Sequence, residues 1–122
     1  DYRYADGKWS VKEVLGHIAD AERVFAYRLL RIARADKAPL AGFDENAWAD
    51  IAPHGRRTLA QVVDDLIAVR RATISLIESL DEAALGNLGV ANNNPVSGRA
   101  ICWIIAGHAG HHLGILRERY NA

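Results

Sequence analysis

Apolar residues recur at helical spacing in three long stretches of the chain, and no stretch alternates convincingly as a strand would. Two of these stretches open at capping boxes, in which Ser10 and Thr58 are followed three residues later by Glu or Gln. The third opens at Ser97, just after a proline. The pattern predicts helices over about 10–36, 58–80 and 97–120, with Pro39 stopping the first. An all-α fold follows.

The connections between these helices are long. Residues 37–57 and 81–96 are rich in turn-forming residues, and the first has room for one helical turn at 44–48. The first helix should be roughly 39 Å long, at about 1.5 Å per residue. A connection of about 20 residues can cross that distance, so the first two helices need not be antiparallel. Both connections are long enough to shape the mouth of a pocket.

Composition limits the class of protein. The 122 residues are half apolar, which favours a single domain over residues 1–122. Lys plus Arg and Asp plus Glu number 15 each, so the chain lacks the basic character of nucleic-acid-binding proteins, and no apolar run is long enough to span a membrane. The lone Cys102 forms no internal disulfide, which favours a cytoplasmic location. Because the chain lacks methionine and begins at Asp1, we expect its true start to lie upstream.

Two histidines interrupt the apolar stripe of the last helix. His108 and His112 are one helical turn apart, in the middle of the stripe that includes Ile101, Ile105 and Ile115. Two imidazoles that face a core at this spacing form half of a transition-metal site.

His17, in the apolar arc of the first helix, is the candidate third ligand. It comes level with His112 if the first and last helices run antiparallel. Three neutral imidazoles would leave other metal positions open, as catalytic sites do, and the ion could activate water or a thiol. A bundle whose histidines simply pack in the core, without metal, is the alternative.

Other polar residues could assist such a site. Glu22 and Arg70 interrupt apolar arcs, and we expect them to form an ion pair inside the bundle; alternatively Glu22 shuttles protons near the metal. Asp20 is expected at the surface, or beside a ligand imidazole that it orients. His111 flanks the stripe and could support or replace a ligand. His54, in a loop with proline and glycine, is expected to be exposed.

No nucleophilic triad or phosphate-binding loop is visible, and nothing near Cys102 marks it as an activated thiol. Trp9, Trp48 and Trp103 are expected to be packing residues.

Two segments carry a family resemblance. Residues 8–23 place Trp9 before a capped helix that contains His-x-x-Asp-x-Glu, and residues 107–115 contain His-x-x-x-His. Together they resemble the DinB/YfiT-like superfamily, over nearly the whole chain. The resemblance implies an up-down-down-up four-helix bundle whose metal is bound at His17, His108 and His112. The family has a further helix ahead of the Trp9 segment, so we expect the first helix to be missing from this chain.

The resemblance also implies a function. We expect a cytoplasmic, metal-dependent enzyme, often a homodimer in this family, that acts on a small molecule. A divalent ion, zinc or nickel, would activate water for hydrolysis or a low-molecular-weight thiol cosubstrate for S-transfer. The alternative is a non-catalytic metal-binding or dimerisation module, in which His111 or a partner's side chain fills the open metal position.

Overall fold

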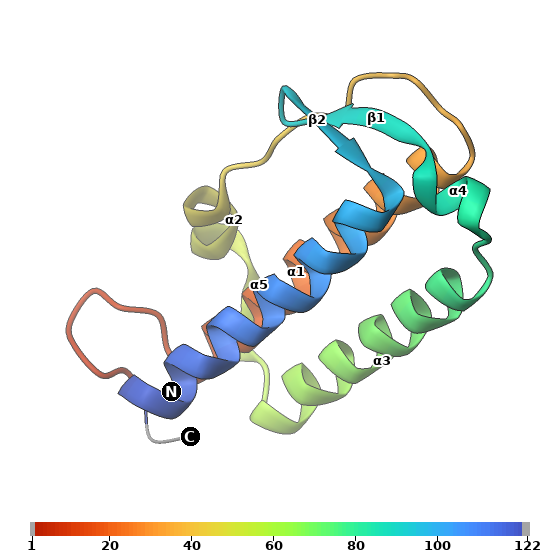
Figure 1. The fold of residues 1–122 in the computed structure, drawn as a ribbon. Helices are drawn as coiled ribbons and strands as arrows, with labels where there is room; N and C mark the ends of the chain where they lie inside the picture. The colour runs from red at the N-terminus through yellow and green to blue at the C-terminus, as the bar shows by residue number, and fades with distance from the viewer. Residues whose placement is uncertain (1, 121–122) are drawn as a thin grey trace.

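Three long helices form the framework of the protein. The computed structural model describes residues 2–120, and its long helices are α1 (Val11–Ala33), α3 (Leu59–Glu78) and α5 (Gly98–Arg119). The connections contain the shorter elements α2 (Glu45–Ile51), the 3-10 helix η1 (Pro53–Arg56), α4 (Glu82–Gly86), β1 (Leu88–Ala91) and β2 (Asn94–Ser97) (Figure 1). The predicted all-α class is confirmed.

The helices begin where the capping residues predict. Ser10 and Thr58 form complete capping boxes with Glu13 and Gln61, and the Ser97 side chain accepts a hydrogen bond from the backbone of Ala100. Each helix ends slightly earlier than the apolar pattern suggested. In α1 the cause is local, because the backbone turns into the left-handed region at Ala35.

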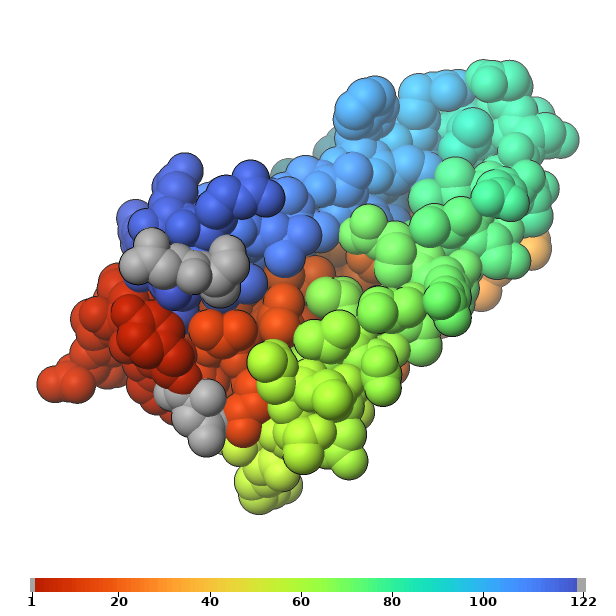
Figure 2. Space-filling view, turned by 90° about the horizontal axis from the view of Figure 1, so that it is seen from below, coloured from red at the N-terminus to blue at the C-terminus, as the bar shows by residue number. Residues whose placement is uncertain are grey.

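α1 is the central helix and packs against both α3 and α5. α3 runs in the same direction as α1, whereas α5 runs in the opposite direction (Figure 1). In a space-filling view from below, atoms of α1 are visible between α5 and α3 (Figure 2). The antiparallel pairing of α1 and α5 is the arrangement that brings His17 level with the two histidines of α5.

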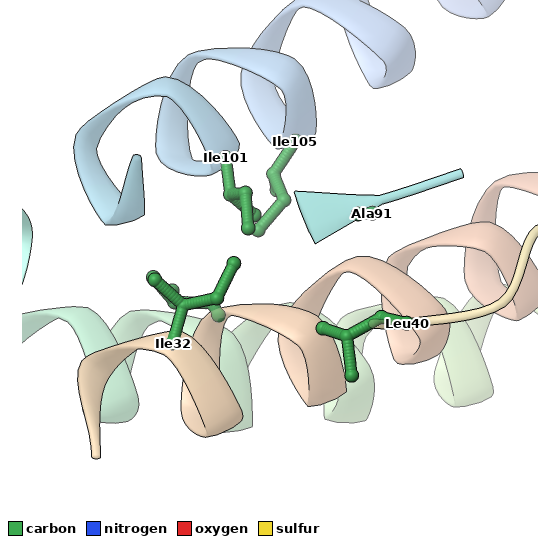
Figure 3. Close-up of a cluster of buried hydrophobic side chains, with 6 residues drawn as sticks. Ile32, Leu40, Ala91, Ile101 and Ile105 are labelled. Carbon is green, nitrogen blue, oxygen red and sulfur yellow. The ribbon is translucent and has the colours of Figure 1, made fainter. Parts of the chain in front are cut away.

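Apolar side chains gather at the two ends of the α1–α5 pair. Near β1 and β2, a cluster joins both helices to β1 and to the loop that follows α1. Its members include Ile32, Leu40, Ala91, Ile101 and Ile105 (Figure 3). Toward the other end, a second cluster is formed by Val14, Ile18, Ala109, Leu116 and Tyr120. The histidines adjoin this second cluster, because Trp9 packs against it and also contacts the ring of His17.

The expectation that the chain forms no strands is wrong for residues 88–97. β1 and β2 pair antiparallel, from Leu88 opposite Ser97 to Ala91 opposite Asn94. Asn92 and Asn93 both have positive φ, 50° and 65°, as a two-residue type I′ turn requires. The backbone of Leu40 bonds to both Val90 and Asn92, which ties the preceding loop to the hairpin. Strands of four residues are too short to show alternation in the sequence.

The connections also contain more helix than the sequence predicted. The expected turn at 44–48 is a seven-residue helix, α2, capped by Asp44, while η1 and α4 lie in stretches expected to be loop. None of the helices formed within residues 2–120 combines the length and the apolar character that a membrane span needs.

Candidate metal centre

The structure brings together the three histidines that the sequence singled out. His17 is buried on α1, and His108 and His112 are half-buried on α5. The Nε2 atoms of His17 and His108 lie 3.1 Å apart. One ring nitrogen from each of the three residues lies within 4.8 Å of the other two. The rings meet edge to face, with centroids 4.5 to 4.9 Å apart.

Aromatic side chains enclose this cluster. The ring of Trp9 lies 4.8 Å from that of His17, and the ring of Phe25 lies 5.4 Å from that of His108. Trp9 directly precedes the capping box of α1, and Phe25 lies on α1 two turns beyond His17. Aromatic side chains therefore cover part of the histidine cluster.

This environment keeps the imidazoles neutral. Burial lowers the pKa of His17 to about 4, and the repulsion that a protonated ring would meet from protonated His112, His108 and His54 acts in the same direction. Burial, with the corresponding repulsion from His108 and His111, also lowers the pKa of His112 to about 4. The pKa of His108 is lowered by burial, although the carboxylates of Glu45 and Glu22 act in the opposite direction. A neutral imidazole has one ring nitrogen with a lone pair, so at neutral pH each of the three rings can act as a metal ligand.

The three imidazole donors fit a divalent transition metal of intermediate softness. Imidazole nitrogen is a preferred ligand of zinc, nickel, copper and iron. Because the cluster supplies three nitrogens from one chain, a metal bound there would have coordination positions left for water or substrate. Such an arrangement fits a metal-binding protein with an open site.

Sequence reasoning missed Glu45. Its Oε2 atom lies 4.0 Å from Nε2 of His17, and its side chain is 53% exposed. Glu45 is the first residue of α2, and Asp44 caps that helix by accepting from the backbone of Asn46 and Ala47. The only sequence signal was an acidic pair at the start of the expected turn. Nothing local showed that this connection folds back over His17.

The expectation that His54 is exposed is wrong. His54 is 5% exposed, and its Nε2 lies 3.0 Å from Oδ2 of Asp20. The ring fits against Gly16, where an added Cβ would lie 2.2 Å from Cγ of His54. Gly16 therefore makes room for η1 to pack on α1, directly beside His17 in the chain. Among the residues that the structure describes, Asp20 pairs with His54 rather than with one of the three clustered histidines, and it is not a free surface acid.

Glu22 and Arg70 form the ion pair inferred from the helical wheels. The Arg70 Nε donates to both carboxylate oxygens at 3.0 Å, and its Nη2 donates to Oε1 at 2.7 Å. Glu22 is 2% exposed, so the pair satisfies a buried carboxylate and links α1 to α3. The hydrogen bonds that Arg70 donates to the Glu22 carboxylate raise the pKa of Arg70.

Three other side chains take no direct part in the cluster. His111 is exposed, with its ring 5.2 Å from that of His112. Burial raises the pKa of the half-buried Cys102 thiol, which leaves it a poor nucleophile. Trp103 is 74% exposed, so the expectation that it packs in the fold is wrong.

The family of this chain follows from a match to a family model. A model described as the DinB superfamily matches residues 1–116. The chain belongs to the DinB superfamily. Its curated relatives include two proteins named "Putative metal-dependent hydrolase", from Oceanobacillus iheyensis and Bacillus mycoides. Both are 28% identical to this DinB chain, over 93% and 99% of its length; it spans 66% and 72% of theirs.

A solved structure shares the fold. YfiT from Bacillus subtilis, described as "a probable metal-dependent hydrolase with an unusual four-helix bundle topology", superposes with a TM-score of 0.75. The likeness covers 96% of this chain and 70% of YfiT at 18% identity, so it is evidence of fold alone. The chain thus has the fold of a DinB/YfiT-type bundle, with three long helices in its described residues.

Proposed function

We propose that this DinB protein is a metal-dependent enzyme in which His17, His108 and His112 hold one divalent ion. The observation that carries the proposal is the convergence of three neutral imidazole nitrogens within 4.8 Å. The names of the two hydrolase relatives support a metal-dependent reaction. We also propose a cytoplasmic location, since the single Cys102 forms no internal disulfide.

When bound, zinc or nickel would lower the pKa of water for hydrolysis, or of a low-molecular-weight thiol for S-transfer. The chain's own groups would do the rest. Trp9 and Phe25 keep bulk water away from the imidazoles and so maintain them as neutral ligands. Glu45 has a half-exposed carboxylate 4.0 Å from His17, and its Oε2 would accept the proton released by the nucleophile, directly or through one water.

The choice between hydrolysis and thiol transfer is open to a direct assay. The names of the relatives favour hydrolysis. Metal-loaded protein is incubated with an activated ester, and separately with an alkylating electrophile with and without added thiols. Turnover of the ester without thiol supports the hydrolase, whereas turnover that requires a thiol supports the transferase. A non-catalytic module in which His111 fills the open metal position is disfavoured, because His111 is exposed and is not one of the three histidines whose ring nitrogens converge.

The metal site itself is tested by elemental analysis of protein purified without a His-tag. We expect about one zinc or nickel ion per chain, lost in the variants His17→Ala and His108→Ala. His111→Ala is the matched control, on the same helix but outside the cluster, and should keep its metal. Far-UV circular dichroism checks that each variant is folded. The proposal fails if the parent takes up no metal after incubation with zinc and nickel, or if both variants retain it.

Metal binding should also resist mild acid. Because the pKa values of His17 and His112 are about 4 and that of His108 is also lowered, protons should compete with the metal at a lower pH than they would at ordinary histidines with a pKa of about 6.5. We expect metal affinity to fall less between pH 7 and about 5 than it would at a site of three ordinary imidazoles.

A further inference from the structure

A cavity of about 300 Å³ opens beside His112. It lies between the N-terminal segment that precedes α1 and the last turns of α5, with Asn46 of α2 at its edge. Trp9 and Ile115 contribute apolar wall. Three larger cavities, of about 650, 470 and 360 Å³, lie elsewhere on the described residues, and none of the three histidines lines any of them. The smaller cavity is the one that a molecule reacting at the metal centre would use.

The charged side chains that line this cavity are both cationic. Lys8 and Arg119 line it, and no aspartate or glutamate does. Neither cation forms an ion pair with a carboxylate within the part of the chain that the structure describes. The two cations come from opposite walls, one from the N-terminal segment and one from α5.

Contacts with Tyr4 hold Arg119 in position and leave most of its N–H donors available to a ligand. Its Nη1 donates to the hydroxyl of Tyr4 at 3.2 Å, and the guanidinium lies 5.7 Å from the centre of the Tyr4 ring. The Tyr4 ring in turn packs edge-on against Tyr120 at 4.9 Å. A guanidinium has five N–H donors in a planar fork that matches an anionic oxygen pair, and the contact with Tyr4 occupies one of them.

We infer that this cavity is a binding site for a small anionic molecule. Its carboxylate, or another oxyanion, would lie between Lys8 and Arg119, and its reactive end would point along the apolar wall to His112. Pockets for small molecules are typically apolar with a few placed polar groups, and the volume is at the lower end of their range of about 300 to 1,000 Å³. The inference rests on the proposed function, since it names the class of molecule that the metal centre would accept.

The test measures binding by thiols that differ only at the end remote from sulfur. Protein loaded with cobalt(II) is titrated with 3-mercaptopropionate, with the neutral 3-mercaptopropanol and with the cationic 3-aminopropanethiol, following the visible absorption of the cobalt. We expect 3-mercaptopropionate to bind about three- to tenfold more tightly than the neutral thiol, as partly exposed ion pairs allow, and the cationic thiol most weakly. 2-Mercaptoethanesulfonate, compared with 3-mercaptopropionate, shows whether the site prefers a tetrahedral oxyanion to a carboxylate.

Variants locate the anion site. Lys8→Gln and Arg119→Gln should each remove most of the preference for the anionic thiol while leaving the affinity for 3-mercaptopropanol unchanged. Arg117→Gln is the matched control, because Arg117 is exposed in the same last turn of α5 but does not line the cavity. Lys8→Gln keeps the test independent of the packing between Arg119 and Tyr4.

The outcomes separate the two proposals. If cobalt binds and the thiols bind with equal affinity, the anion site is wrong and the metal centre stands. A preference for the anion that survives both variants, or that Arg117→Gln abolishes equally, also overturns the placement at Lys8 and Arg119. If cobalt does not bind at all, the proposed function fails, and this inference fails with it.

Discussion

Gly16 is the residue whose missing side chain shapes the surroundings of His17. The His54 ring occupies the space where a Cβ would lie, 2.2 Å from Cγ and 2.4 Å from Nδ1. Both residues are buried, so a methyl group there must displace the ring and its bond to Asp20. We predict that Gly16→Ala lowers the free energy of unfolding by about 1–2 kcal/mol, the cost of overpacking less the gain in helix propensity. Urea denaturation measures the change.

Two further variants isolate the cause. Gly110→Ala, in the middle of α5 with open space around its position, should raise the free energy of unfolding by about 0.5–1 kcal/mol. In a His54→Ala background, where the ring is absent, Gly16→Ala should no longer destabilise the protein. If the penalty persists in the double variant, the contact between Gly16 and His54 is not its source.

At the scale of elements, the hairpin depends on the backbone of its turn. Asn92 and Asn93 both adopt the left-handed conformation, which asparagine tolerates and a β-branched residue does not. We predict that Asn93→Gly is neutral or slightly stabilising, whereas Asn93→Val lowers the free energy of unfolding by about 1–2 kcal/mol. Thermal and urea unfolding of the two variants provides the comparison. Equal stability of the glycine and valine variants would mean that the turn has another conformation in solution.

The difference between the long helices and the short hairpin explains which elements the sequence could predict. The three long helices follow from local signals, namely the capping boxes at Ser10 and Thr58 and the repeat of apolar residues every three or four positions. The hairpin has no comparable local signal, since its four-residue strands are stabilised by Leu40, which is distant in sequence, and by the cluster around Ile32. Tertiary contacts determine such short elements.

The candidate site likewise has residues that the sequence could predict and residues that it could not. His17, His108 and His112 could be selected because each interrupts an apolar stripe, and antiparallel packing of two long helices then brings them level. The positions of Glu45 and His54 depend on how the connection of residues 34–58 folds back over α1, which periodicity does not encode. Gly16, next to His17 on a buried helix face, was the one local indication that another segment approaches closely there.

At the scale of the whole molecule, exposed apolar side chains on α3 favour self-association. Ile67 and Ile74 are two turns apart on one face of α3, and they are 44% and 46% exposed. Covering such a face with a second copy removes apolar surface from water. We therefore predict that the protein is a homodimer at micromolar concentration, which light scattering coupled to gel filtration measures.

The face that forms the dimer can be tested by charge. Ile67→Lys combined with Ile74→Lys should shift the protein to monomer, because two lysines on this face would be desolvated or would repel their symmetry mates. Ile51→Lys is the matched control, since Ile51 is 81% exposed and belongs to α2 rather than to α3. Metal content should stay at the parental level in both variants, because the three histidines lie on α1 and α5. A parent that is monomeric at every concentration, or a monomer produced equally by Ile51→Lys, would contradict a dimer through α3.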